Sequence, residues 1–188
     1  MTTFRTGVDV VEVARARSLR GRPALPGDKS ISHRALMVAL LTPGTTRIEG
    51  LSGGADVAST AGIVEALGAT LAGDLEPGTP AVRVGSPGIA GLSPPTATLD
   101  CGNSGTSLRL FAGILAGQPF EATLDGDASL RARPVARIIE PLRAMGAALG
   151  GRRHDTLPPI TIRGRPDLVA IDWTPSVPSA QVKSAILL

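Results

Sequence analysis

Three similar motifs at almost equal intervals constrain the fold of this 188-residue chain more than any other feature of its sequence. Each motif places a serine at the entrance of an apolar segment, and these serines are Ser30, Ser104 and Ser179, which lie 74 and 75 positions apart. Serine is a favoured helix N-cap because its hydroxyl accepts a hydrogen bond from the first turn. Near-equal spacing of such helix starts is typical of an internal structural repeat. We therefore expect copies of one supersecondary unit.

The segments between these serines predict the same order of elements, β-α-β-α-β-β, in an α/β (α+β) fold. Hydrophobic periodicity, β-branched runs and glycine or proline stops give the individual elements. In the first unit we expect helices at 31–41 and 56–69, with Ser30 and Asp56 as N-caps, and strands at 45–50, 69–73 and 81–85. In the second we expect strands at 96–100, 120–126, 147–151 and 160–164 and helices at 105–117 and 134–147, with Pro134 in the first turn. A third unit is expected to start with a strand at 168–173 and a helix at 179–188.

These elements predict a division of the chain. Residues 1–21 are expected to lead in from another domain, and residues 22–188 to form an incomplete substrate-binding domain with units at about 22–92, 93–165 and 166–188. The sequence ends on apolar residues with no C-cap and no following strands. We therefore expect a fragment of a longer protein, or a truncated gene product.

Composition excludes several classes of function. Aromatic residues make up only 2% of the chain, so base stacking has almost no side chains to use and a nucleic-acid partner is disfavoured. No run approaches the roughly 18 apolar residues that a membrane span needs. The first residues carry acids and arginines where a secretory signal needs an apolar segment. The single cysteine, Cys101, excludes an internal disulfide. We expect a soluble, cytoplasmic protein.

Positive charge gathers near the first motif, although the net charge is only +3. Residues 1–36 carry seven basic and three acidic residues, whereas residues 37–99 carry two and five. A helix N-terminus has free N–H groups and the positive end of the helix dipole, so it can bind anions. If the units pack around a pseudo-threefold axis, three such termini could converge on one cleft. A solvated basic edge is the alternative, and charge alone favours it.

Individual residues around these helix entrances suit anionic ligands. Lys29 can neutralise a phosphate or carboxylate, and Arg34 lies about one turn further along, where a solvated helix face is an equal alternative. Gly105 in "GNSGT" lacks a Cβ atom, so a ligand can approach the backbone closely. In "SLRARP", an arginine can clamp a carboxylate or phosphate with two hydrogen bonds, and we expect Arg131 rather than Arg133 to face solvent. Cys101, His33 and His154 have no partners in the sequence that indicate metal binding or catalysis, so Cys101 is expected to be a small buried side chain.

Together, "LPGDKSISHRAL", "GNSGT", "GDASLRARP" and "SAQVKSAILL", in this order, resemble the N-terminal half of the 5-enolpyruvylshikimate-3-phosphate (EPSP) synthase family, from about residue 18 to residue 188. The resemblance implies an inside-out barrel domain, of which this chain holds two units and a truncated third. It also implies transfer of the enolpyruvyl group from phosphoenolpyruvate to the 5-hydroxyl of shikimate 3-phosphate, with loss of phosphate and with no cofactor or metal.

The resemblance assigns roles residue by residue. Lys29 would be catalytic and contact both substrates, Gly105 and Arg133 would bind phosphoenolpyruvate, and Gln181 would touch both ligands. Shikimate 3-phosphate would be held by Ser30, Arg34, Ser179, Ala180 and Gln181. Some members of the family have a second serine where this chain has Ala180, and others also carry Ser-Ala-Gln. A glycine at the position of Gly105 implies sensitivity to glyphosate.

In this family the proton-transfer residues lie in the second half of the enzyme, so the resemblance implies that the chain alone is inactive and that its partner is the missing C-terminal half. A non-catalytic binding half that needs a complementary chain is the main alternative. A UDP-N-acetylglucosamine enolpyruvyl transferase is less favoured because it has Lys-Asn where this chain has Lys29-Ser30. RNA 3′-phosphate cyclase, which shares the repeat, needs a catalytic histidine that the sequence does not place.

Overall fold

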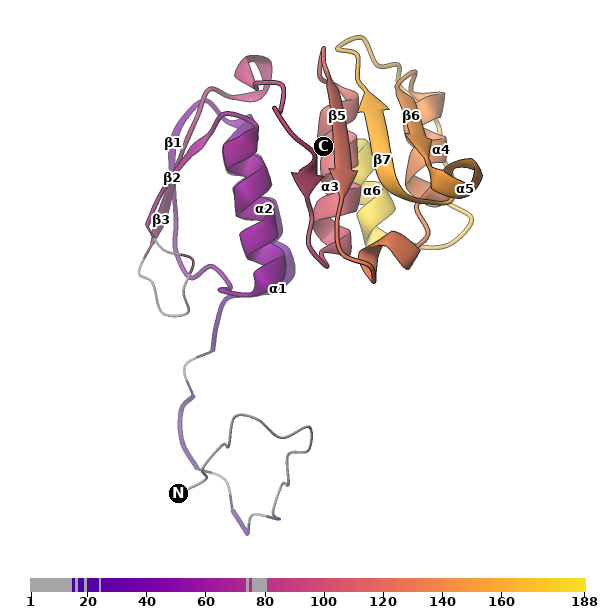
Figure 1. Ribbon diagram of the computed structural model, residues 1–188. Helices are drawn as coiled ribbons and strands as arrows, with labels where there is room; N and C mark the ends of the chain where they lie inside the picture. Colours follow the sequence, from indigo (N-terminus) through magenta and orange to yellow (C-terminus); the bar gives the residue numbers. More distant parts are fainter. Residues whose placement is uncertain (1–14, 16, 19, 24, 74, 76–80) are drawn as a thin grey trace.

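The computed structural model describes residues 15, 17–18, 20–23, 25–73, 75 and 81–188, which form two similar α/β units followed by one more helix (Figure 1). The elements of the first unit are α1 (Lys29–Leu41), β1 (Gly44–Ile48), α2 (Ala55–Ala66), β2 (Thr70–Ala72), β3 (Val82–Ser86) and η1 (Ile89–Gly91). Those of the second are β4 (Leu99–Asp100), α3 (Gly105–Ala116), β5 (Glu121–Asp125), η2 (Leu130–Ala132), α4 (Ala136–Ala144), β6 (Ala148–Gly151), α5 (Arg152–Asp155) and β7 (Leu157–Arg163). Helix α6 (Ala180–Leu187) ends the described chain.

The two sheets confirm the internal repeat. The first has the order β1-β3-β2, and the second has the order β4-β5-β7-β6. In both, the strand after the first helix pairs antiparallel with the last strand of the unit, so Thr46 lies opposite Val84 and Thr123 lies opposite Thr161. The short strand between them in sequence flanks the other side of that last strand. Helices α1 and α3 therefore occupy equivalent places in the repeat.

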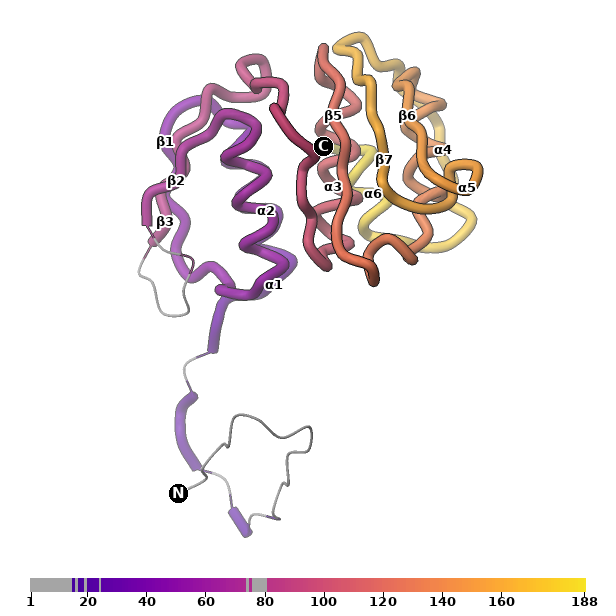
Figure 2. The backbone as a smooth tube through the Cα atoms, in the orientation of Figure 1, coloured from indigo at the N-terminus to yellow at the C-terminus, as the bar shows by residue number. Residues whose placement is uncertain are grey.

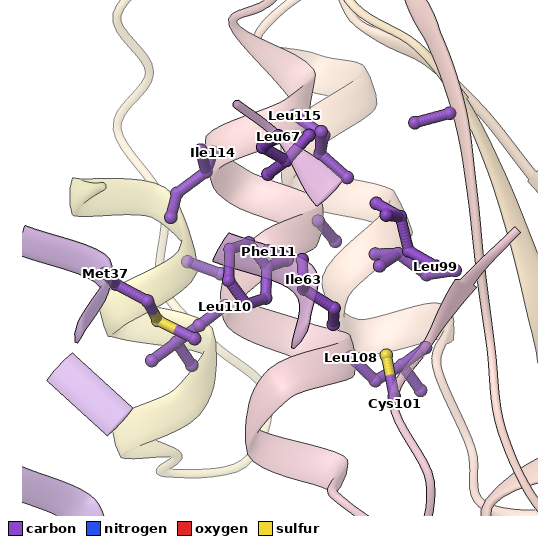
Figure 3. Close-up of a cluster of buried hydrophobic side chains, with 14 of the residues drawn as sticks. Met37, Ile63, Leu67, Leu99, Cys101, Leu108, Leu110, Phe111, Ile114 and Leu115 are labelled. Carbon is purple, nitrogen blue, oxygen red and sulfur yellow. The ribbon is translucent and has the colours of Figure 1, made fainter. Parts of the chain in front are cut away.

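Helix α3 forms the centre of the molecule. It lies between the two helices of the first unit and the second sheet, and it packs against α6 (Figures 1 and 2). Ten of its residues from Ser107 to Ala116 are buried, and Phe111 lies among Met37, Ile63 and Leu110 (Figure 3). One continuous apolar core thus joins both units and fixes how the N-terminal ends of their helices sit relative to each other.

The close contact of α3 with α6 depends on a glycine. A Cβ atom added to Gly113 would lie 1.9 Å from the carbonyl oxygen of Ala185. Only glycine therefore lets the two helices approach this closely, since backbone atoms cannot yield as a flexible side chain can.

Two predicted helix starts are wrong. The N-cap of α1 is Asp28 and not Ser30, because the Asp28 carboxylate accepts a hydrogen bond of 2.8 Å from the Ile31 N–H. The N-cap of α2 is Gly54 and not Asp56, which lies in the first turn. The serine caps of α3 and α6, Ser104 and Ser179, are confirmed. The three equivalent caps are therefore Asp28, Ser104 and Ser179, and their spacing is still nearly equal.

Other expected elements are absent from the described residues. Residues 168–173 form no strand, because no neighbouring strand in the described chain offers them hydrogen bonds. The expected order β-α-β-α-β-β also requires a strand before α1, but the described residues from 22 to 28 form none, so the described first unit has three strands where the second has four. Helix α4 begins at Ala136, which leaves Pro134 before the helix and not in its first turn. The expected N-terminal segment, 1–21, lies mostly outside the described residues.

Neither a membrane crossing nor a metal cluster is found in the described part of the chain. None of its helices combines the length and the apolar character that a membrane span requires. Its histidine, cysteine and acidic side chains nowhere gather in a group of three or more that could hold a metal ion.

Candidate functional site

The N-terminus of α3 combines a serine N-cap, a glycine turn and free backbone N–H groups. Ser104 caps the helix by accepting a hydrogen bond of 3.1 Å from the Ser107 N–H. The turn before it depends on Gly102, which has a φ of +53° and donates its N–H to Asp100 Oδ1 at 2.7 Å. Gly105 is then the first helical residue, and the N–H groups of this first turn have no acceptor inside the helix.

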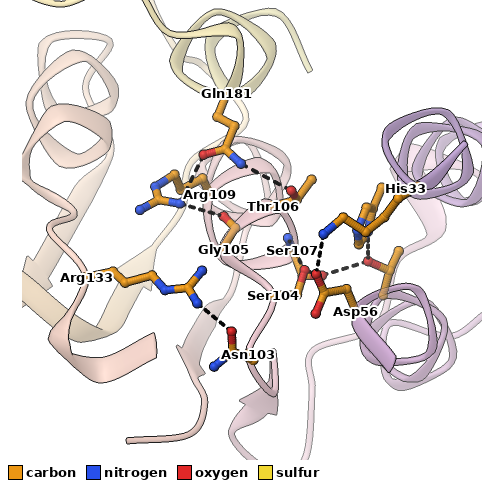
Figure 4. A network of polar contacts seen from close by, with 12 residues as sticks. His33, Asp56, Asn103, Ser104, Gly105, Thr106, Ser107, Arg109, Arg133 and Gln181 are labelled. Atoms are coloured by element: carbon orange, nitrogen blue, oxygen red, sulfur yellow. Dashed lines mark hydrogen bonds and ion pairs between the residues drawn. The ribbon is translucent and has the colours of Figure 1, made fainter. Parts of the chain in front are cut away.

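Two arginines flank Gly105 (Figure 4). A Cβ atom at this position would lie 2.5 Å from one terminal nitrogen of Arg109 and 3.3 Å from one of Arg133. Arg133 donates a hydrogen bond to Asn103 Oδ1, and Asn103 in turn donates to Asp127 at 2.7 Å. A helix N-terminus and two guanidinium groups therefore lie close together at Gly105, and this grouping of hydrogen-bond donors and positive charge suits a phosphate or carboxylate group.

Sequence reasoning missed Arg109. It is only 5% exposed, and burial, reinforced by Arg137 and Arg133, lowers its pKa to about 10. Because this pKa is still well above 7, the group stays charged at neutral pH. The signal that could have found it is its place as the single charged residue within the apolar segment 105–117, where burial of charge needs a specific reason.

The third helix entrance meets the second through Gln181. Ser179 caps α6, and Ala180, its first residue, is exposed. The Gln181 side chain accepts a hydrogen bond of 3.0 Å from Arg109 and donates one of 3.1 Å to Thr106 Oγ1 (Figure 4). The structure therefore brings Gln181 together with Gly105, through Arg109.

The first helix entrance carries the predicted Lys29, Ser30 and Arg34. Lys29 pairs with Asp56 of α2 at 2.8 Å, and both Lys29 and Ser30 are exposed. Arg34 donates to the Ser30 carbonyl at 3.1 Å and to the Ser184 hydroxyl of α6 at 2.9 Å. Arg34 is thus fixed between two helices and is not a freely solvated side chain.

A buried polar chain connects the first two helix entrances, which sequence reasoning also missed. His33 Nδ1 lies 2.6 Å from Thr60 Oγ1, Thr60 lies 2.7 Å from Ser107 Oγ, and Ser107 donates to Ser104 Oγ at 2.7 Å. Burial lowers the pKa of His33, and Lys29 and Arg34 add to this against the opposing effect of Asp56. These hydrogen bonds link α1 and α2 to Ser104, the N-cap of α3.

The remaining candidates do not join this arrangement. Arg131 is exposed and forms a two-pronged ion pair with Asp125, with the shortest distance 2.6 Å. Cys101 is fully buried, and burial with Asp100 and Asp125 nearby raises the pKa of its thiol, which confirms it as an inert packing residue. His154 lies exposed in the left-handed turn that joins β6 and β7.

The family is shown by comparison with known proteins. Residues 13–188 match the family described as EPSP synthase (3-phosphoshikimate 1-carboxyvinyltransferase). The chain belongs to the EPSP synthase family. It is 51% identical over 170 residues to the 3-phosphoshikimate 1-carboxyvinyltransferase of Acidithiobacillus ferrooxidans, a match that covers 90% of this chain and 38% of the relative. It is 53% identical over 174 residues to the 3-phosphoshikimate 1-carboxyvinyltransferase of an Anaeromyxobacter species, a match that covers 93% of this chain and 39% of that relative.

Solved structures agree with this EPSP synthase assignment. The EPSP synthase from Acinetobacter baumannii is 40% identical and superposes with a TM-score of 0.83 over 89% of this chain and 37% of that one. The fold is therefore the α/β fold of EPSP synthase. The chain spans less than two fifths of the length of these relatives.

Proposed function

We propose that this chain supplies one wall of the active site of a 3-phosphoshikimate 1-carboxyvinyltransferase. In this reaction the 5-hydroxyl of shikimate 3-phosphate gives up its proton and attacks C2 of phosphoenolpyruvate as C3 gains a proton, and the tetrahedral intermediate then loses phosphate together with a proton from C3. Both substrates carry several negative charges. The observation that carries the proposal is the grouping of a helix N-terminus with Arg109 and Arg133 around Gly105, where no carboxylate of the described residues forms a hydrogen bond with either arginine.

The residues divide between the two substrates. Gly105 and Arg133 would receive a charged group of phosphoenolpyruvate, and Lys29, which is exposed and paired only with Asp56 among the described residues, would turn to contact both substrates. Shikimate 3-phosphate would lie against the entrances of α1 and α6, at Ser30, Arg34, Ser179, Ala180 and Gln181. The hydrogen bond between Arg34 and Ser184 supports this division, because it joins α1 directly to α6.

Turnover is proposed to need the sequence that corresponds to the rest of these relatives. This chain covers 38% of the Acidithiobacillus ferrooxidans protein. A non-catalytic binding role for the chain by itself is therefore the second candidate. The names of the relatives favour shikimate 3-phosphate over UDP-N-acetylglucosamine as the acceptor.

A complementation assay tests the proposal. The 188-residue chain is mixed with the remaining part of the Acidithiobacillus ferrooxidans relative, and phosphate release from phosphoenolpyruvate is followed with and without shikimate 3-phosphate. We expect release only when both polypeptides and both substrates are present. Lys29→Met should abolish it, whereas Lys183→Met, which removes another exposed lysine, should not. Turnover by the chain alone would refute the need for the second part.

If the mixture releases no phosphate and the chain also fails to bind shikimate 3-phosphate, the proposed function is wrong. If the chain binds shikimate 3-phosphate but the mixture is inactive, the binding role remains and the catalytic role is contradicted.

A further inference from the structure

Arg109 joins three separate segments of the candidate site. One terminal nitrogen donates to the Gly105 carbonyl at 3.2 Å and to Gln181 Oε1 at 3.0 Å, and the other donates to the Pro134 carbonyl at 3.3 Å. Gly105 and Gln181 are themselves proposed substrate contacts, and Pro134 directly follows a third, Arg133. A single side chain thus connects the starts of α3 and α6 with the segment before α4.

The charge of Arg109 is not neutralised within the described chain. All three of its hydrogen-bond partners are neutral oxygens, and its buried Nε has no partner. The charged groups that affect it most, Arg137 and Arg133, are also positive. A buried charge without a counterion is unfavourable for folding, so an apolar residue would serve a purely structural purpose better in this helix.

The contact with Gln181 has a chemical consequence that depends on the guanidinium. Arginine carries only hydrogen-bond donors, so the Gln181 amide must turn its oxygen toward Arg109. Its Nε2 group then faces Thr106 Oγ1, at 3.1 Å (Figure 4). One Nε2 hydrogen is used by Thr106, and the other can be donated to a ligand. Without Arg109 the amide could flip and present an acceptor instead.

We propose that Arg109 is a positioning residue that fixes the direction of the Gln181 amide and holds the Gly105 and Arg133 segments against it, so that Gln181 donates a hydrogen bond to the anionic substrate. This inference rests on the proposed function, because it takes Gln181 as a substrate contact.

The first test reads the Gln181 amide directly, without any ligand. The chain contains only two glutamines and one asparagine, Gln118, Gln181 and Asn103, so its side-chain amide NMR spectrum has three pairs of signals. Gln118 is 3% exposed and lies at the other end of α3, which makes it an internal reference. In Arg109→Met, we expect the Gln181 pair to move to the shifts of a freely rotating amide while the Gln118 pair stays in place. Arg137→Met removes a neighbouring exposed positive charge and should leave both pairs unchanged.

The second test measures binding of shikimate 3-phosphate by calorimetry. Loss of a charge-assisted hydrogen bond should weaken binding by Arg109→Met roughly tenfold, and Arg109→Lys should recover part of this. The losses of Arg109→Met and Gln181→Ala should not add in the double variant, because both remove the same contact. A merely structural arginine would lower the melting temperature without this coupling.

The outcomes separate this inference from the proposed function. If the unchanged chain binds no shikimate 3-phosphate, the proposed function is wrong, and so is the inference that Gln181 donates a hydrogen bond to this substrate. If the chain binds but Arg109→Met leaves the Gln181 signals and the affinity unchanged, only the positioning role is overturned. If Arg109→Met does not fold, the positioning role of Arg109 is tested instead with Arg109→Lys and Gln181→Glu, by the same binding and unfolding measurements. The new carboxylate of Gln181→Glu should pair with Arg109, raise the melting temperature and abolish binding, and an unchanged melting temperature and affinity would contradict the inference.

Discussion

Substitution of Gly105 by alanine tests the crowding at the centre of the site. The added methyl group would lie 2.5 Å from an Arg109 nitrogen and 3.3 Å from an Arg133 nitrogen. Cβ atoms in folded proteins essentially never approach other heavy atoms closer than 3.0 Å, so the Arg109 guanidinium would have to move by about half an ångström. It is 5% exposed and bound to three oxygens, so we expect this movement to weaken or break at least one of its hydrogen bonds.

The size of the effect follows from two opposing contributions. Loss of a hydrogen bond from a charged donor costs about 1.5 to 3 kcal/mol. Replacement of glycine by alanine in a helix offsets about 0.5 to 1 kcal/mol of this through the smaller entropy of the unfolded chain. We therefore expect Gly105→Ala to lower the free energy of unfolding by about 1 kcal/mol, which corresponds to a fall of roughly 2 to 4 °C in melting temperature for a chain of this size.

The assay is thermal unfolding followed by circular dichroism, with Gly62→Ala as the matched control. Gly62 lies within α2, is exposed, and has open space where its Cβ would be. Gly62→Ala should therefore raise the free energy of unfolding by up to about 1 kcal/mol through helix propensity alone. If Gly105→Ala stabilises the chain as Gly62→Ala does, the crowding argument is refuted. In the complemented enzyme, Gly105→Ala should also reduce inhibition by glyphosate, and equal inhibition of both proteins would contradict that expectation.

Three further predictions concern the stability of the folded chain. Gly113→Ala should force α3 away from Ala185 and lower the free energy of unfolding by about 1 to 3 kcal/mol. Urea unfolding measures this change, and a stability equal to that of the unchanged chain would contradict the close approach of the two helices. Thr60→Val keeps the side-chain shape but leaves Ser107 and His33 without the hydroxyl that both contact. It should lower the free energy of unfolding by about 1 to 3 kcal/mol in the same experiment, and an unchanged free energy would contradict a stabilising role for these buried hydrogen bonds. Because the folded-state pKa of His33 is lowered, the unfolded chain gains a proton first as pH falls, so stability should be full above about pH 6.5 and decrease below it. The decrease should be smaller in His33→Gln, and parallel pH profiles for the two proteins would refute this.

Much of the fold could be predicted because most elements of the repeat are determined by residues that are close together in the sequence. Hydrophobic periodicity, glycine stops and helix caps act within a few residues, and they identify α1 to α4 and most of the strands. The error at Ser30 arose because two capping residues, Asp28 and Ser30, lie close together and only the backbone geometry decides which one accepts the N–H. The error at Asp56 arose because α2 begins after Gly54, which has no side chain to mark the start. The strand expected at 168–173 failed because strand formation depends on a neighbouring strand and not on local composition.

The candidate site could be predicted only in part. Residues at helix entrances, such as Lys29 and Gly105, are visible in the sequence because capping and glycine patterns mark them. Arg109 and the polar chain from His33 to Ser107 depend on contacts between helices that are far apart in the sequence. Nothing in the local sequence indicates those partners. The substrate-binding and catalytic roles assigned to the candidate residues stay predictions, and these residues are Lys29, Ser30, Arg34, Gly105, Arg133, Ser179, Ala180 and Gln181.

The most direct test of the central claim is a calorimetric titration of the 188-residue chain with shikimate 3-phosphate and, separately, with shikimate. If the helix entrances form a site for the phosphorylated substrate, shikimate 3-phosphate should bind with one site per chain and shikimate at least about tenfold more weakly, because it lacks the group that pairs with the helix N-termini and arginines. The affinity for shikimate 3-phosphate should fall as salt is added. Equal affinities for the two compounds, or no binding of shikimate 3-phosphate, would contradict the account.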